Sequence, residues 1–259
     1  MCGRFVSSSP PDELARYFSA APPEEPAKGS NPPTANFNVA PTTDIYAVFE
    51  DGTTRRLEAF HWGLVPFWAK DLSVGNRMIN ARSETLLSSN AYKRPFVRRR
   101  CIIPADGFFE WAAVQGHKKK QPYFIHRRDG EPLAFAGLWE VWKGPKDQET
   151  DDEESATYLR SCTIITTSAN DTMTPVHNRM PVILPPSGWA QWLDRENSDT
   201  DALGRLLVPA PNELLTMHPV SLEVNNVRNG GAHLIEPVAA VDPDGKGAPA
   251  GPSAVGSAE

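Results

Sequence analysis

Short apolar runs separated by turn residues dominate the chain after its first forty residues or so. The runs are rich in β-branched and aromatic residues, and turn signals such as Asp51-Gly52 and Asp129-Gly130 separate them. This pattern predicts β-strands. The predicted strands are residues 45–50, 55–64, 101–111, 122–127, 133–142 and 162–169.

Helical periodicity is confined to short segments. Residues 9–19 are predicted as a helix because Leu14, Tyr17 and Phe18 fall on one face, and Ser9 is its expected N-cap. Further short helices are expected near residues 81–90, 187–193 and 200–207.

The order of these elements bears on the fold class. Helices and strands do not alternate at the spacing of repeated βαβ units, which argues against a doubly wound parallel sheet. We therefore predict an α+β fold: a single domain with a curved, mainly antiparallel β-sheet or barrel-like core flanked by short helices. The domain is expected to span residues 1–237, followed by a disordered tail rich in Ala, Gly and Pro at 238–259.

Charge is distributed unevenly along the chain. The net charge is −6, yet residues 145–157 alone hold six acids and one lysine and are expected to form a disordered loop between two strands. Residues 77–100 carry seven basic side chains against the single acid Glu84. Such a local basic patch suits a phosphate-binding groove, although a solvated surface face would look the same. The basic residues are Arg77, Arg82, Lys93, Arg94, Arg98, Arg99 and Arg100.

No segment of the sequence suggests a membrane span or a secretory signal. No run approaches the roughly 18 apolar residues of a membrane helix, and the first residues lack the apolar core of a signal peptide. We expect a cytoplasmic protein that makes no membrane contact.

The three cysteines are Cys2, Cys101 and Cys162. Their odd number and wide spacing argue against a disulfide framework or a zinc site. Cys101 and Cys162 each begin an apolar run and are expected to be buried core thiols. Cys2 begins no such run.

Cys2 has distinctive chemistry if the initiator methionine is removed. It then carries a free α-amine and a thiol on adjacent carbons, and such a 1,2-aminothiol condenses with an aldehyde to form an imine and then a thiazolidine ring. With a pKa of about 7.7–8.0, roughly a tenth of the α-amine is neutral at pH 7, whereas a lysine is neutral about once in 2,500 molecules. A cysteine at the second position can equally be incidental.

The residues around Cys2 carry a family resemblance. Met1-Cys2-Gly3-Arg4-Phe5 resembles the N-terminus of the SRAP (SOS response-associated peptidase) family of abasic-site processing proteins, and the resemblance extends in order over residues 2–237. The further motifs are Asn38-Val39-Ala40-Pro41, Trp62-Gly63-Leu64-Val65-Pro66, Ile79-Asn80-Ala81-Arg82-Ser83-Glu84, Pro104-Ala105-Asp106-Gly107-Phe108-Phe109-Glu110-Trp111, His177-Asn178-Arg179-Met180-Pro181 and Asn226-Val227-Arg228-Asn229.

The resemblance implies a covalent crosslink between Cys2 and the ring-opened aldehyde of an abasic site in single-stranded DNA, which shields the lesion during the DNA damage response. It implies catalytic roles for Cys2, Asn80, Glu110 and His177. In a bacterium, such a protein is expected to associate with the nucleoid when DNA is damaged. A β-elimination lyase reaction through the same imine is possible.

The chemistry of these residue types is consistent with the implied roles. Imine formation needs a proton donor and acceptor, and Glu110 among Phe108, Phe109 and Trp111 supplies one if it faces an apolar site rather than solvent. His177 could protonate the departing sugar oxygen O4′, and Asn80 could orient the Cys2 amine without adding charge. For His177 and Asn80 the alternative is a purely structural role.

DNA contacts are expected from the same resemblance. Arg4 and Arg82 are candidate phosphate ligands, and Thr167 a candidate backbone or phosphate contact. Pro41, Phe67 and Trp68 could stack on the bases that flank the lesion, although Phe67 and Trp68 could instead be core residues.

Two other classes of function remain open at this stage. One is a cysteine peptidase or amidase that uses its N-terminal amine as base, including removal of its own methionine. The other is a non-catalytic binder of single-stranded DNA in which Cys2 is incidental. No cofactor is expected, because no Gly-rich phosphate-binding loop is present, and no metal is expected. A monomer is the expected state.

Overall fold

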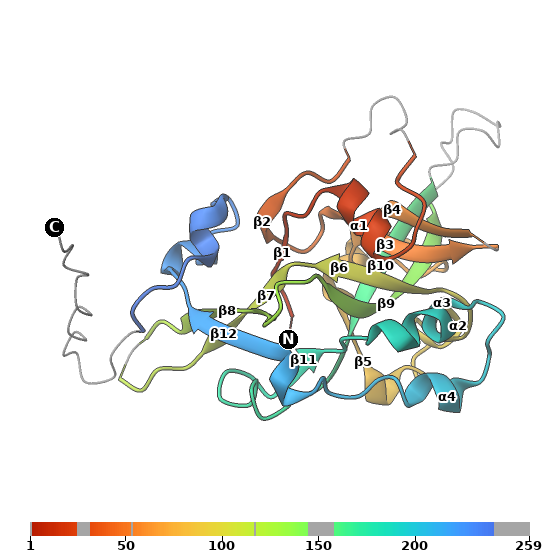
Figure 1. Ribbon diagram of the computed structural model, residues 1–259. Coiled ribbons are helices and arrows are strands. Elements are labelled where there is room, and N and C mark those ends of the chain that lie inside the picture. Colours follow the sequence, from red (N-terminus) through yellow and green to blue (C-terminus); the bar gives the residue numbers. More distant parts are fainter. Residues whose placement is uncertain (1, 25–31, 53, 117, 145–157, 241–259) are drawn as a thin grey trace, which may run out of the picture.

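The computed structural model describes residues 2–24, 32–52, 54–116, 118–144 and 158–240. These residues form a single α+β domain, in which two β-sheets are flanked by short helices (Figure 1).

A closed five-stranded barrel lies at the centre of the domain. It closes because β9 pairs with β6 on one side and with β10 on the other. The contact between β4 and β10 is parallel, and the remaining four contacts are antiparallel. In order around the barrel, the strands are β3 (Asp44–Asp51), β4 (Thr54–Trp62), β10 (Tyr158–Ser168), β9 (Leu133–Lys143) and β6 (Arg100–Ala105).

The barrel strands are apolar on both faces, which explains why their sequences are nearly continuous apolar runs. In β3, Ile45, Ala47 and Phe49 belong to one core cluster, while Tyr46 and Val48 belong to a second. Alternate residues of a strand point to opposite faces, so each face of β3 has its own apolar partner.

Helices cover one of these two faces. Leu14 and Phe18, from the α1 region, pack in the cluster that contains Val48, and so do Trp189 and Trp192 of α3. The α-helices among the described residues are α1 (Pro11–Tyr17), α2 (Lys93–Arg98), α3 (Trp189–Leu193) and α4 (Thr200–Gly204).

A second, five-stranded antiparallel sheet adjoins the barrel. Its order is β12 (Leu215–Pro219), β8 (Gln121–Arg127), β7 (Gly107–Ala112), β1 (Phe5–Ser7) and β2 (Asn36–Val39). Two short strands, β5 (Asn80–Arg82) and β11 (Arg179–Pro181), extend the barrel sheet by pairing with β10. Short 3₁₀ helices in the connections are η1 (Leu72–Arg77), η2 (Ser83–Thr85), η4 (Pro186–Gly188), η5 (Asn212–Leu214), η6 (Leu222–Asn225) and η7 (Ala232–Ile235).

Two local predictions at the junction of the sheets were wrong. Residues 101–111 are not one strand: β6 ends at Ala105 in the barrel, and β7 begins at Gly107 in the other sheet. Asp106 lies between them, and its carboxylate accepts hydrogen bonds from the backbone amides and hydroxyls of Ser8 and Ser9. Ser9 is therefore bound to Asp106, and α1 begins after Pro10 without a side-chain cap.

Other helix predictions hold in part. Short helices occur within 187–193 and 200–207, but the region 81–90 contains only a single 3₁₀ turn, η2. Helix α2 was not predicted from the sequence. The acidic segment 145–157 lies outside the described residues, as does all of the predicted tail beyond residue 240.

The basic stretch 77–100 contains a buried arginine whose hydrogen bonds connect α2 and α3 to the barrel. Arg100, at the start of β6, is 3% exposed. Its guanidinium donates hydrogen bonds to five backbone carbonyl oxygens, which belong to Phe96, Val97, Trp192, Asp194 and Asn197. Arg100 therefore plays a structural part and is not available to bind phosphate.

We predict that Arg100→Met lowers the free energy of unfolding by about 3 kcal/mol or more, because buried carbonyl groups lose their donors. Urea denaturation followed by circular dichroism measures the change. The matched control is Arg98→Met, the same substitution at an exposed position, which should change stability by less than about 1 kcal/mol. Equal effects of the two substitutions would contradict the structural role of Arg100.

Candidate active site

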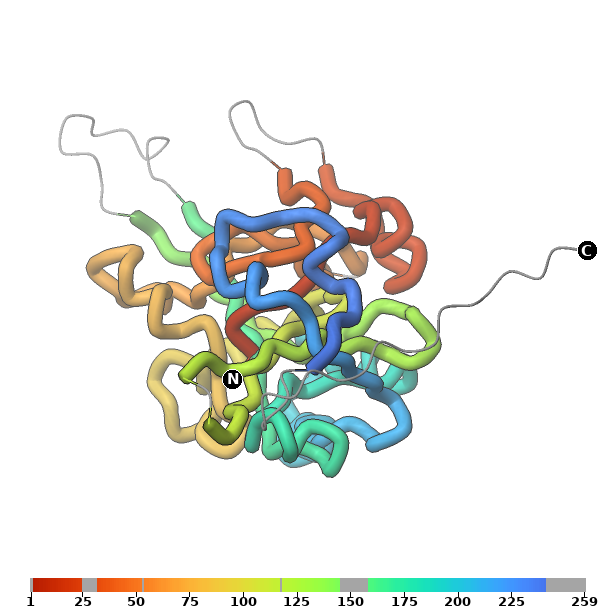
Figure 2. Tube along the Cα trace, turned by 90° about the vertical axis from the view of Figure 1, so that its left-hand side faces the viewer, coloured from red at the N-terminus to blue at the C-terminus, as the bar shows by residue number. Residues whose placement is uncertain are grey.

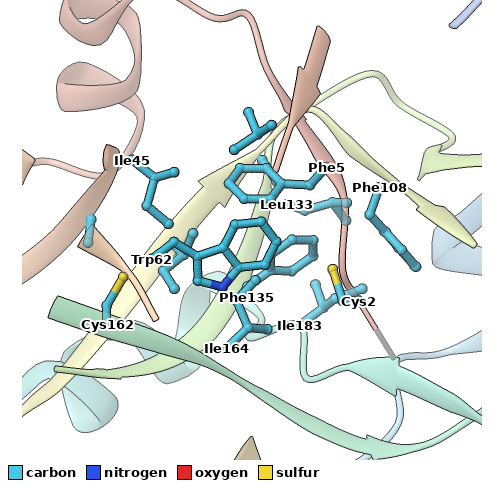
Figure 3. Packing of buried hydrophobic residues seen from close by; sticks show 14 of the residues in the cluster. Cys2, Phe5, Ile45, Trp62, Phe108, Leu133, Phe135, Cys162, Ile164 and Ile183 are labelled. Carbon is cyan, nitrogen blue, oxygen red and sulfur yellow. The ribbon is translucent and has the colours of Figure 1, made fainter. Parts of the chain in front are cut away.

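Cys2 is fully buried at the edge of the barrel core. Two residues of chain separate it from Phe5, which anchors β1 by pairing with Val39 of β2 and Phe108 of β7. Figure 3 shows the Cys2 side chain within the apolar cluster that contains Phe135 and Ile183. No local pattern in the sequence signals this burial, because Cys2 stands outside any apolar run.

The surroundings of Cys2 keep its thiol protonated. Burial, and secondarily the negative charge of Glu110, raise the pKa of the Cys2 thiol well above its usual value. Cys101 and Cys162 are buried as predicted, and burial likewise raises their pKa values. A buried neutral thiol is a weak nucleophile by itself, so chemistry at Cys2 needs a second reactive group.

Asn80 contacts Cys2 directly. Its side-chain Nδ2 donates a hydrogen bond of 2.8 Å to the carbonyl oxygen of Cys2. Its Oδ1 is buried and has no hydrogen-bond partner among the described residues. The position of Asn80 follows from β5, in which it pairs with Ile164 of β10, and the Tyr92 hydroxyl donates to its backbone carbonyl at 3.3 Å.

Glu110 is a buried carboxyl group beside Cys2. It lies in the middle of β7, opposite Tyr123 of β8, and it is 3% exposed. The flanking Phe108 and Phe109 are buried in two different apolar clusters. Glu110 therefore faces the interior, and the alternative of a solvent-facing strand carboxylate does not apply.

His177 is held in one tautomer by its own turn. It lies in the connection between β10 and β11, where its Nδ1 accepts a hydrogen bond of 2.9 Å from the backbone amide of Arg179. In a neutral imidazole the other nitrogen then carries the proton, so Nε2 is a donor. The side chain of Arg179 braces the same turn through Glu84 and the carbonyl oxygen of Thr166.

Strand β10 brings several candidate residues together at its C-terminal end. Arg82 of β5 pairs with Thr166, and the neighbouring Thr167 pairs with Met180 of β11. Arg82 is exposed, which suits a phosphate ligand, whereas Thr167 is 5% exposed.

Arg4 is bound largely by the protein itself. Its Nη1 donates to Oδ1 of Asn38 at 2.6 Å and to the carbonyl oxygen of Val224 at 2.9 Å. Its guanidinium lies over the ring of Trp111, 5.9 Å from the centroid, and burial lowers the pKa of Arg4. The sequence did not point to Asn38 or Tyr92, whose side chains form hydrogen bonds to Arg4 and to the backbone of Asn80. Asn38 opens one of the quoted motifs, but nothing marked Tyr92.

The aromatic candidates lie on the surface. Phe67 is 50% and Trp68 53% exposed, which rules out the alternative that they are core residues. The Arg94 guanidinium lies over the Phe67 ring at 5.0 Å. Pro41 is half-buried in the turn after β2.

The predicted basic patch divides into two groups. Arg99 pairs with the buried Glu140, and Arg100 is enclosed as described above, so neither belongs to an open basic surface. The exposed members are Arg77, Arg82, Lys93, Arg94 and Arg98.

Clusters of metal ligands and membrane-spanning helices are both absent from the part of the chain that the structure describes. There, no three or more His, Cys, Asp or Glu side chains gather in a way that could hold a metal ion. None of the helices described is long and apolar enough to span a membrane.

Comparison with known proteins places the chain among close relatives. The family model for SOS response associated peptidase (SRAP) matches residues 1–227. Abasic site processing protein YoqW of Bacillus subtilis is 39% identical over 236 residues, which are 91% of this chain and 99% of that protein. Abasic site processing protein YoaM of the same organism is also 39% identical over 236 residues, covering 91% of this chain and 98% of that protein.

The fold is shared with solved structures. A crystal structure of a protein from Bacteroides thetaiotaomicron matches with a TM-score of 0.75 at 20% identity, covering 92% of this chain and 100% of that one. At this identity the likeness establishes the fold alone.

The electrostatic environment of Cys2 leads to a prediction about thiol labelling. Glu110→Gln should speed iodoacetamide labelling of Cys2 at pH 8, by up to about tenfold, because loss of the negative charge lowers the pKa of the thiol. Peptide mass spectrometry measures the extent of labelling at each cysteine separately. Cys101 is the internal control, because burial alone raises its pKa. Unchanged labelling of Cys2, or equal acceleration of Cys101, would refute the coupling between Glu110 and Cys2.

Proposed function

Because the chain belongs to the SRAP family, we propose that it processes abasic sites in DNA by bonding covalently, through Cys2, to the ring-opened sugar in single-stranded DNA. The relatives YoqW and YoaM carry the name of abasic site processing proteins. The proposal requires removal of Met1, which makes Cys2 the first residue.

The observation that carries the proposal is the grouping of Cys2 with Asn80 and Glu110. Asn80 holds the backbone of Cys2 through a 2.8 Å hydrogen bond, and the charge of Glu110 acts on the Cys2 thiol. The buried Oδ1 of Asn80 is a suitable acceptor for a proton of the Cys2 α-amine once Met1 is gone. Such a hydrogen bond would direct the amine lone pair at a bound aldehyde.

The proposed reaction begins at the amine. The neutral α-amine of Cys2 adds to the aldehyde carbon C1′ of the open sugar, and the resulting carbinolamine loses one water to form an imine. The sulfur then adds to the same carbon, the thiol proton passes to the nitrogen, and a five-membered thiazolidine closes. The crosslink thus has the summed mass of protein and DNA less one water.

Glu110 is proposed to transfer protons in this sequence. Loss of water from the carbinolamine needs a proton delivered to the departing oxygen and one removed from nitrogen. A buried carboxyl group close to Cys2 is positioned to do both. The same group can catalyse the reverse steps, because a catalyst acts on both directions of a reaction.

His177 is proposed to act before the amine does. An abasic sugar is mostly closed, and its ring opens when a proton reaches O4′. The Nε2–H of His177, which follows from the Nδ1 contact with Arg179, is a suitable donor.

DNA is proposed to be bound on the surface that carries the exposed basic and aromatic residues. Arg82 follows Asn80 by two residues in β5 and is exposed, which suits a phosphate contact next to the lesion. Phe67 and Trp68 offer exposed faces for base stacking.

Arg4, Pro41 and Thr167 remain proposed contacts, and Arg4 would have to bind phosphate with the part of its guanidinium that Asn38 and Val224 do not use.

A cysteine peptidase is less well supported. Such an enzyme attacks with a thiolate, which neighbouring positive charge stabilises. Burial and the negative charge of Glu110 act on Cys2 in the opposite direction. A reaction that begins at the neutral α-amine does not require a thiolate at Cys2.

The covalent step is tested with a single-stranded oligonucleotide that carries one abasic site. The wild-type protein, after intact mass analysis has verified removal of Met1, should give a band that survives a denaturing gel and has the summed mass less one water. Cys2→Ala should give no band, whereas Cys101→Ala, which alters another buried cysteine, should keep it.

Cys2→Ser extends this test to the order of steps. Serine retains the α-amine, so borohydride should trap its imine with the DNA even though no thiazolidine forms. Absence of a wild-type crosslink would refute the proposed function. Failure to trap the serine variant would refute attack by the amine as the first step.

The separate roles of Glu110 and His177 lead to a second prediction. Glu110→Gln and His177→Ala should each slow crosslinking to an abasic site by about 10²–10⁴-fold, the usual contribution of general acid–base catalysis. An oligonucleotide bearing an open-chain aldehyde needs no ring opening. It should restore the rate of His177→Ala but not that of Glu110→Gln, as measured in quenched time courses. Glu131→Gln, at an exposed site, is the control, and equal rescue of both variants would contradict the assignment.

A further inference from the structure

Three sequence motifs that lie far apart along the chain meet around Asn38, and one of them contains Cys2. Arg4 belongs to the first motif, Asn38 opens the second, and residues 226–229 form the last. We call residues 221–229, which include η6, the clasp segment. In Figure 2 this segment, in blue, runs close to the N-terminal segment in red, in agreement with the hydrogen bond from Arg4 to the Val224 carbonyl oxygen.

Asn38 is the centre of this meeting point. It is 2% exposed. Its Nδ2 donates to the carbonyl oxygens of Asn226 at 3.0 Å and Asn229 at 2.9 Å, with a longer contact of 3.4 Å to that of Val224. Its Oδ1 accepts from Arg4 at 2.6 Å. One side chain thus joins the N-terminal segment to the clasp segment.

Arg4 and Trp111 reinforce the same junction. Arg4 donates to the Val224 carbonyl oxygen as well as to Asn38. Trp111, over which Arg4 lies, donates from Nε1 to Oδ1 of Asn225 at 2.7 Å. Trp111 follows Glu110 directly in β7, so the clasp segment is tied both to the strand of Glu110 and to the segment of Cys2.

The N-terminal segment depends on these hydrogen bonds for its position. Strand β1 begins only at Phe5, and Gly3, between Cys2 and Arg4, has the greatest backbone freedom of any residue. We infer that Asn38 is a positioning residue: by fastening Arg4 to the clasp segment, it fixes Cys2 against Asn80 and Glu110. The consequence for the reaction rate rests on the proposed function, whereas the consequence for the mobility of Cys2 does not.

Thiol labelling tests, without DNA, whether Asn38 holds the N-terminal segment and Cys2 in place. In Asn38→Ala, iodoacetamide should label Cys2 at least about tenfold faster than in the wild type, because local opening frees the N-terminal segment. Labelling of Cys101 and Cys162 in the barrel should change by less than about twofold. Asn38→Asp keeps an acceptor for Arg4 but loses the donors, so its Cys2 should label at an intermediate rate. Asn38→Asp also replaces Asn38→Ala in this comparison if the alanine variant folds poorly.

Val227→Ala is the matched control. It shortens an exposed side chain of the clasp segment but retains the backbone carbonyl of Asn226 that accepts from Asn38. Its labelling of Cys2 should stay within about twofold of the wild type.

Crosslinking kinetics test the consequence for the reaction. At saturating abasic-site oligonucleotide, Asn38→Ala should crosslink about 10- to 100-fold more slowly, the usual effect of misplacing a reacting group by about 1 Å. The half-saturating DNA concentration should stay within about threefold, because Asn38 is buried and Arg4, the neighbouring proposed DNA contact, keeps its hydrogen bond to the Val224 carbonyl oxygen.

The outcomes separate the possibilities. Faster labelling of all three cysteines together would mean general destabilisation, and a rise in half-saturating DNA with an unchanged maximal rate would mean a DNA contact. Either result overturns the inference. If the wild type forms no crosslink, the proposed function fails, and the labelling comparison alone decides whether Asn38 holds Cys2 in place.

Discussion

Strand β10 holds both the barrel and the candidate site, because four other strands pair with it. Its contacts with β4 and β9 close the barrel. Its contacts with β5 and β11 attach the strand that carries Asn80 and the strand that follows His177. Two of these contacts are parallel, and parallel neighbours need long connections along the chain. This is why Asn80 reaches β10 from far away in the sequence, whereas Glu110 comes from β7 of the second sheet.

The site takes its chemical character from being built into the core. Cys2 packs with barrel side chains, Glu110 is buried between strands, and the amide oxygen of Asn80 is buried without a partner among the described residues. A buried acceptor left unsatisfied costs about 1–3 kcal/mol, and such departures from ideal packing tend to occur at functional sites. The equally buried Asn38 carries no such cost, because its amide donates to the Asn226 and Asn229 carbonyl oxygens and accepts from Arg4.

Local pattern and tertiary structure disagree most where the chain passes between sheets. Residues 101–111 have the pattern of one strand, but the Asp106 carboxylate is bound by Ser8 and Ser9, and the chain changes sheets there. The helix α2 escaped prediction because its polar sequence has no strong apolar periodicity. Its position depends instead on a side chain beyond the helix: Arg100 donates hydrogen bonds to the carbonyl oxygens of Phe96 and Val97.

The sequence by itself determined the α+β class, the six main apolar segments and the identity of Cys2, Asn80, Glu110 and His177 as candidates. It could do so because residue type and short-range periodicity are local properties, and because ordered motifs mark a family. Only the tertiary structure decided that Cys2 and Glu110 are buried together, that Arg4 is bound by Asn38, and that Arg100 is structural. These facts depend on contacts between residues far apart in the chain, which strand pairing and side-chain packing create only when the whole domain folds.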